Sequence, residues 1–201
     1  IMVYPFTDSQ ILGISTFPYS LKDFFLEGTQ QVSASWITLE NLSFPYCISI
    51  NSSYIYEQST DERINQNDAA ITLAHELGHY LGLRHVFSEG GTTSMCTDTD
   101  YCKDTPSYNR SEYEQWLNNL DKQNKYQLKD LAKRYSCEKG EYEAHNIMDY
   151  AYCFYNEITL EQRKRIRHIL NYSPLIPGPK ESRIDTRGVQ GRLNLPICIM
   201  K

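Results

Sequence analysis

No apolar stretch in this sequence approaches the roughly 20 residues of a membrane-spanning helix, and no charged segment followed by an apolar one opens the chain. The sequence also lacks any run of lysine or arginine beside aromatic residues, and its formal net charge is −5. Because nucleic-acid binding requires cations that neutralise phosphates, this composition argues against a nucleic-acid partner. There is no internal repeat or low-complexity block either. With 40% hydrophobic residues among 201, we expect one domain with a single substantial core.

Cysteine is scarce, and its six positions include no CxxC pair of the kind that binds zinc or acts as a redox dithiol. An even, scattered set favours disulfide bonds in an oxidising compartment, and the alternative is a set of buried free thiols in a cytosolic protein. Because Ile1 opens directly on a strand-like segment, we expect the chain to begin inside a longer precursor, with an export signal or lipid anchor ahead of it. The expected location is therefore secreted, periplasmic or at the cell surface. The cysteines are Cys47, Cys96, Cys102, Cys137, Cys153 and Cys198.

The first half of the chain reads as strands followed by a helix. β-Branched and aromatic residues predict strands at 1–6 and 32–39, and one or two more within 45–57. Leucines at 73, 77 and 81 then form a stripe with a spacing of four. This pattern predicts a buried amphipathic helix that begins after a cap at Asn67 or Asp68.

The second half is less regular. Residues 111–134 are helical in pattern but very polar, which indicates a solvated insertion. Thr159 and Gln162 form a capping box for a last helix at about 160–171. The remainder, 173–201, is rich in Pro, Gly and Arg, and we expect an irregular surface tail.

The segment HELGHYLGLRH, residues 75–85, holds three of the five histidines. Residues four apart project from the same face of a helix, so His75 and His79 can place ring nitrogens about 2.0–2.1 Å from a single ion. Gly82 suits the left-handed residue that ends a helix, and the turn it permits can bring His85 to the same ion. Three neutral nitrogens indicate zinc, and a site with three protein ligands leaves a position open for water, as in catalytic sites.

These residues resemble the HExxHxxGxxH signature of the metzincin zinc endopeptidases. The segment NIMDY, 146–150, resembles the Met-turn of that family, in which the methionine, here Met148, passes beneath the metal site. More narrowly, ILGISTFP, GLRHVF and DYCKDTP are similar to the pappalysin and cytophagalysin branch, at 11–18, 82–87 and 100–106. The likeness covers about residues 11–170 in the same order. The polar stretch 107–136 and the tail after 172 match no motif of the family.

The resemblance implies an α+β fold of the metzincin type. In such a fold a twisted mixed sheet and an active-site helix lie above a cleft, and an irregular C-terminal subdomain carries the Met-turn. We expect the upper subdomain at about 1–85, the lower one at about 86–172 and the tail at 173–201. The sheet should expose an edge strand within 46–56, on which an extended polypeptide substrate can pair by strand addition.

The implied activity is that of a zinc-dependent endopeptidase. Glu76, next to the first ligand, can accept the proton of a water in the open position and pass it to the leaving amine. Tyr150 matches a position whose phenol lies on or near the metal in some families, and the alternative is a packing role. Asp149 is expected to organise the turn by hydrogen bonding. Two rival functions are an inactive, zinc-stabilised binding module and a toxin-like or adhesion protein that acts through its tail; the intact Glu76 argues against inactivity.

The resemblance also suggests a structural calcium site within 96–106, and the alternative is a polar loop with solvated aspartates. It further implies two disulfide bonds, Cys96 with Cys137 and Cys102 with Cys153, which leaves Cys47 and Cys198 to pair or to remain free. The calcium ligands would be Asp98, Asp100, Asp104 and the carbonyl of Thr105.

Overall fold

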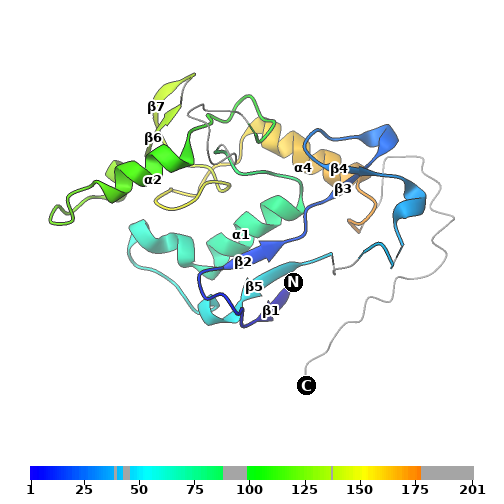
Figure 1. The fold of residues 1–201 in the computed structure, drawn as a ribbon, viewed down its shortest axis with the longest axis horizontal. Coiled ribbons are helices and arrows are strands. Elements are labelled where there is room, and N and C mark those ends of the chain that lie inside the picture. The colour runs from blue at the N-terminus through cyan, green and yellow to red at the C-terminus, as the bar shows by residue number, and fades with distance from the viewer. Residues whose placement is uncertain (39, 43–45, 88–98, 137, 178–201) are drawn as a thin grey trace.

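The computed structural model describes residues 1–38, 40–42, 46–87, 99–136 and 138–177. The chain has a mixed α+β structure in which the helix α1 packs against two strands of a small sheet, β2 and β5 (Figure 1). A second long helix, α4, packs against β3, and α2 and the hairpin β6–β7 lie at the opposite end of the molecule from the sheet (Figure 1).

The elements are mostly short. The strands are β1 (Met2–Tyr4), β2 (Gly13–Ser15), β3 (Tyr19–Leu21), β4 (Gln30–Val32), β5 (Ile48–Asn51), β6 (Lys133–Ser136) and β7 (Gly140–Glu143). The α-helices are α1 (Ala69–Tyr80), α2 (Arg110–Asn118), α3 (Leu128–Leu131) and α4 (Leu160–Tyr172). Short 3-10 helices span Lys22–Phe24, Ala34–Trp36, Ser52–Tyr54 and Glu62–Asn67. None of the helices in the described part of the chain is long and apolar enough to cross a membrane.

The three-stranded sheet has the order β1-β5-β2, with β1 parallel and β2 antiparallel to β5. The predicted edge strand within 46–56 is therefore wrong, because β5 lies between the other two and all four of its residues are buried. Its alternating polar residues do not face solvent. The Asn51 amide donates to the Ile11 carbonyl (2.9 Å) and accepts from the Phe6 N–H (3.4 Å), so segments beside both neighbouring strands satisfy it.

Two strand predictions have opposite outcomes. The prediction for 1–6 is confirmed by β1, but the one for 32–39 is wrong beyond Val32, where β4 ends. From there the chain turns into the 3-10 helix Ala34–Trp36, in which the N–H of Trp36 donates to the carbonyl of Ser33 (3.0 Å). Serines that favour local turns override the β-propensity of Trp36 and its neighbours.

The predicted helix exists as α1 and follows Asp68, but its buried face is not the leucine stripe. Leu77 is 43% exposed, whereas the buried positions are Thr72, His75, Glu76 and Gly78. The inward face of α1 is thus largely polar, which is unusual for a buried helix and typical of one that carries a functional site.

The polar stretch 111–134 is not a single solvated helix. It breaks into α2, α3 and the start of β6, and it buries Tyr113 and Arg134 against the rest of the molecule. The capping box of α4 is confirmed: Thr159 Oγ1 accepts from the N–H of Gln162 (3.3 Å), and Gln162 Oε1 accepts from the N–H of Thr159 (3.0 Å).

A hydrophobic cluster supports the C-terminal end of α1. Met148 is fully buried in it, and a methyl group built on Gly78 of α1 would overlap the Met148 sulfur. The absence of a side chain at Gly78 is what allows Met148 to lie directly against the helix. The buried members of the cluster are Leu83, Val86, Phe87, Tyr108, Tyr113 and Met148.

We predict that Gly78→Ala lowers the free energy of unfolding by about 1 kcal/mol, although alanine is the better helix former, because overpacking costs about 1–3 kcal/mol. Chemical denaturation measures the change. The control is the same substitution in a Met148→Ala background, where the overlap is gone and no loss is expected. An equal loss in both backgrounds would contradict the contact.

Candidate metal centre and active site

Three histidines meet beside the end of α1. The Nε2 atom of His85 lies 3.2 Å from Nε2 of His75 and 3.0 Å from Nε2 of His79. Within the described ranges, these side chains form the one group of His, Cys, Asp or Glu close enough to hold a metal ion. The three positions are those that the sequence predicts as ligands.

Main-chain carbonyls determine how two of these rings are protonated. Nδ1 of His75 lies 2.7 Å from the carbonyl oxygen of Ile147, and Nδ1 of His79 lies 2.8 Å from that of Leu83. A carbonyl only accepts, so each Nδ1 carries the hydrogen and each Nε2 of the neutral ring presents a lone pair. Burial, together with the nearby His79 and His85, holds the pKa of His75 at about 3, so its ring stays neutral.

This arrangement fits a cation. At most one proton, on Nε2 of His85, can lie among the three converging nitrogens, so hydrogen bonds alone cannot satisfy His75, His79 and His85 together. A carbonyl that accepts from the second ring nitrogen of a histidine is also what orients metal-binding imidazoles in proteins.

The turn after α1 brings the third histidine back to the helix. Gly82 has φ +88°, which only glycine adopts readily, and its N–H donates to the carbonyl of His79 (2.9 Å). The N–H of Leu83 donates to the carbonyl of Gly78 (2.9 Å). This turn directs the Leu83 carbonyl onto His79 and places His85 opposite the helix.

A second turn, at residues 146–149, closes the site from the other side. The N–H of Asp149 donates to the carbonyl of Asn146 (3.1 Å), and the N–H of Met148 donates to Asn146 Oδ1 (3.0 Å). The Met148 carbonyl accepts from the N–H of Val86 (3.3 Å), so this turn is tied to the segment that carries His85. The Asp149 carboxylate accepts from the N–H of Tyr150 (2.7 Å) and organises the end of the turn.

Glu76 lines a cavity of about 380 Å³ that it shares with His75, Tyr150 and residues of the 10–13 segment. Burial raises the pKa of Glu76 to about 7. A methyl group on Gly13 of β2 would lie 2.7 Å from Cγ of Glu76, so the glycine lets this strand approach the carboxylate closely. The carboxyl group can therefore exchange a proton near neutral pH inside a partly closed space.

Tyr150 lies at the histidine cluster. Its ring centroid is 4.4 Å from that of His85 and 5.4 Å from that of His75, and its residue is 36% exposed. The guanidinium carbon of Arg110, at the start of α2, lies 4.7 Å from the Tyr150 ring centroid. No motif in the sequence marks Arg110, because it belongs to the stretch that resembles nothing in the family.

Residues 36–171 match the peptidase family M43, described as pregnancy-associated plasma protein-A. The chain belongs to this family. The match confirms the resemblance to the pappalysins, and the three clustered histidines are those of the metallopeptidase signature.

Curated relatives of this M43 chain include proteins named extracellular metalloprotease from the fungi Arthroderma benhamiae and Arthroderma otae. Each is 37% identical over 108 residues, or 52% of this chain. The matched region spans only 32–33% of the length of these relatives. Among solved structures, mature mirolysin from Tannerella forsythia, in complex with a cleaved peptide, is 20% identical with a TM-score of 0.44. That likeness covers 84% of this chain and 50% of the mirolysin chain.

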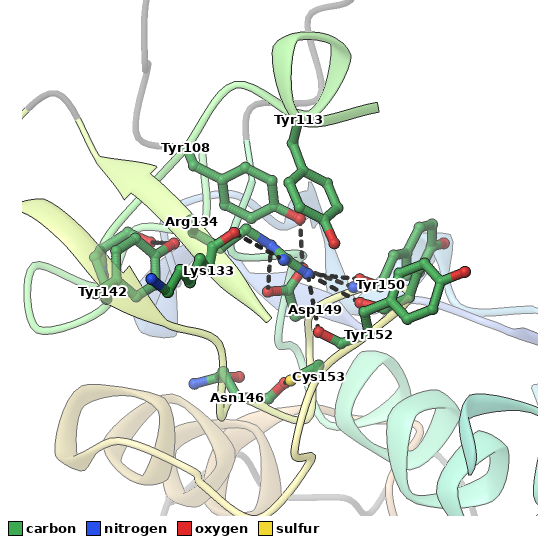
Figure 2. A network of polar contacts seen from close by, with 12 residues as sticks. Tyr108, Tyr113, Lys133, Arg134, Tyr142, Asn146, Asp149, Tyr150, Tyr152 and Cys153 are labelled. Carbon is green, nitrogen blue, oxygen red and sulfur yellow. Dashed lines mark hydrogen bonds and ion pairs between the residues drawn. The ribbon is translucent and has the colours of Figure 1, made fainter. Parts of the chain in front are cut away.

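The segment that carries Tyr150 is held by a buried polar network that the sequence analysis missed. Figure 2 shows Arg134 at its centre, between the rings of Tyr108 and Tyr113 and the backbone that follows Asp149. Nε of Arg134 lies 3.5 Å from Asp149 Oδ2, and the hydroxyl of Tyr108 donates to Asp149 Oδ1 (2.5 Å). Neither arginine nor tyrosine lies in a recognisable motif.

The structure does not support the calcium site. Asp100 Oδ2 accepts from the Thr105 hydroxyl (2.6 Å), and Asp104 Oδ2 accepts from the N–H of Glu161 at the start of α4 (2.9 Å). These oxygens thus serve local hydrogen bonds. Asp98 lies outside the described residues.

The predicted bond between Cys102 and Cys153 is wrong, since both thiols are free. Cys153 packs in a cluster with Leu128 and Ala132, whereas Cys102 lies in the turn in which its N–H donates to Asp100 (2.9 Å). Burial raises the pKa of each thiol to about 12, so both remain protonated. Cys47 is also unbonded, and the remaining three cysteines, Cys96, Cys137 and Cys198, lie outside the described residues.

We predict that the purified chain binds close to one zinc ion and that His79→Ala loses most of it, because two remaining nitrogens hold zinc far less well. Elemental analysis after exhaustive dialysis measures the metal. His168→Ala is the matched control, since its ring contacts the Phe24 carbonyl and lies outside the cluster. Full zinc content in His79→Ala would mean that the ligands are misassigned.

Proposed function

We propose that this chain carries the catalytic centre of a zinc endopeptidase with a metzincin-type fold, in which His75, His79 and His85 hold the metal. The observation that carries the proposal is the convergence of three imidazole nitrogens beside a buried carboxylate that lines the same cavity. Membership of the M43 peptidase family supports the same activity.

Zinc in such a site acts as a Lewis acid that polarises the scissile carbonyl and makes a bound water more acidic. The protein supplies the proton transfers. Glu76 accepts the proton of the attacking water as a carboxylate and then donates it, as a carboxylic acid, to the nitrogen of the leaving amine. A pKa of about 7, raised by burial, suits both steps because neither protonation state is strongly favoured at neutral pH.

We propose that the phenol of Tyr150 donates a hydrogen bond to the oxyanion that develops as the water attacks. Its ring position at His85 and His75 supports this role over one in packing alone. The stacked Arg110 limits the orientations of the ring and leaves a positive charge near the developing oxyanion.

The substrate is proposed to be an extended polypeptide that pairs with β2. This strand is an edge of the described sheet, it contacts α1, and its Gly13 approaches Glu76. A peptide added alongside β2 by main-chain hydrogen bonds would therefore pass the catalytic carboxylate. The proposed strand replaces the one within 46–56.

We further propose that the chain divides into an upper subdomain, about 1–85, a lower one, about 86–172, with the Met-turn at Met148, and a tail at 173–201. The names of the fungal relatives support an extracellular location. The rival, an inactive zinc-stabilised binding module, is disfavoured because it gives no reason to bury the carboxylate of Glu76 in the cavity of the metal site.

Glu76→Gln should retain its zinc and its fold but lose nearly all peptidase activity, because the amide keeps the size of the side chain and cannot accept the proton. The assay is cleavage of a denatured protein mixture, with and without chelator, followed by sequencing of the cut sites. Glu57→Gln, at an exposed position, is the control and should be fully active. An active Glu76→Gln variant would overturn the mechanism.

Tyr150→Phe should lower kcat at least tenfold with KM little changed, since the lost hydrogen bond exists mainly in the transition state. Loss of one oxyanion donor typically costs about 10²–10³-fold. The ring remains, so zinc content and melting temperature should not change. Tyr135→Phe, at a 69% exposed position, is the control. Turnover within about a factor of two of the parent would return Tyr150 to a packing role.

A further inference from the structure

Arg134 is a buried cation in a part of the chain that resembles no family motif. It lies in β6, is 2% exposed, and its guanidinium carbon lies 3.6 Å from the ring centroid of Tyr113. One nitrogen, Nη1, donates to the carbonyls of Leu131 (3.0 Å) and Lys133 (3.3 Å) within its own segment. This half of the guanidinium anchors the arginine to the hairpin region.

The other nitrogen reaches across to the segment that follows the Met-turn. Nη2 donates to three consecutive carbonyls, those of Tyr150 (3.2 Å), Ala151 (2.9 Å) and Tyr152 (3.5 Å) (Figure 2). On the other side of the same residue, the carboxylate of Asp149 accepts from the N–H of Tyr150 (2.7 Å). The ion pair of Arg134 and Asp149 therefore grips the backbone of Tyr150 at both its N–H and its C=O.

That backbone needs such a constraint. Ala151 has φ +43° and Tyr152 has φ +42°, and Tyr155 has φ +50°, all in the left-handed region that side chains disfavour. Residues in this conformation persist only where the surrounding structure imposes it. Three carbonyls brought onto one cationic nitrogen provide that constraint for the first two of them.

We infer that Arg134 is a positioning residue for Tyr150: it holds 150–152 in the left-handed course that keeps the phenol ring on the histidine cluster. The inference rests on the proposed peptidase function. Arginine is suited to this role because its planar fork donates in several fixed directions at once, whereas lysine offers a single point charge. Ala151 and Tyr155 also line the cavity of Glu76, so the same segment forms part of its wall.

Arg134→Lys tests the inference, because it keeps the charge beside Asp149 and removes the fork. We expect zinc content to stay at the parent level, kcat to fall at least about tenfold, and KM to change by less than about threefold. In a Tyr150→Phe background the same substitution should cost less than about threefold, because the group that it positions is already lost. Arg163→Lys, an exposed arginine on α4, is the matched control and should be fully active in both backgrounds.

A second readout is independent of catalysis. Hydrogen exchange of peptides that cover 149–155 should be faster in Arg134→Lys than in the parent, while exchange of α1 is unchanged. If the parent shows no chelator-sensitive peptidase activity, the proposed function fails, but the exchange experiment still tests whether Arg134 holds this segment.

Tyr108→Phe is a milder variant that still decides the question if Arg134→Lys does not fold. It keeps the ring and removes the hydrogen bond to Asp149, and it should also lower kcat in a manner that disappears in the Tyr150→Phe background. The inference is overturned if Arg134→Lys, or Tyr108→Phe in its place, costs the same factor in both backgrounds. Unchanged exchange at 149–155 in Arg134→Lys would overturn it as well.

Discussion

Two hydrogen bonds from imidazoles to main-chain carbonyls hold the centre together: His75 to Ile147 and His79 to Leu83. Each bond fixes which ring nitrogen carries the proton, and each carbonyl belongs to a different turn. The cluster is therefore where α1, the turn after it and the 146–149 turn meet. Any shift of either turn would rotate an imidazole and move its lone pair away from the common point.

The rest of the fold serves to keep those turns in register with the helix. Gly82 permits the first turn through its positive φ, and Gly78 lets Met148 of the second turn lie against α1. The N–H of Val86 joins the two turns through the Met148 carbonyl. Packing and hydrogen bonding thus bring three chain segments to the same site, with α1 as the rigid reference.

The polar stretch after residue 107 extends this support to the catalytic side of the site. It contributes Arg110 above the ring of Tyr150 and Arg134 below its backbone, and it buries the aromatic rings that shield the Arg134–Asp149 pair. A buried ion pair is costly to form, so its presence here is better explained by the backbone that it organises than by stability.

Local patterns in the sequence predict the metal site well. The four-residue spacing of His75 and His79, the glycine at 82 and the capping box of α4 all express short-range geometry, and the structure places each of them as expected.

Features that depend on distant parts of the chain could not be predicted in this way. β5 reads as an edge strand by composition, yet it is central because its partners come from residues 2–4 and 13–15. The leucine stripe of α1 is not its buried face, since the turn with Met148 packs against Gly78 instead. Arg134 carries no local signal at all, because its role exists only once β6 is folded against the 150–152 backbone.

X-ray absorption at the zinc K-edge of the metal-loaded chain tests the central claim most directly. Three imidazoles oriented by their Nδ1 hydrogen bonds predict a first shell with three histidine nitrogens at about 2.0–2.1 Å and one further light atom. A sulfur neighbour at about 2.3 Å, or fewer than three imidazoles in the shell, would contradict the arrangement of His75, His79 and His85 as the metal centre.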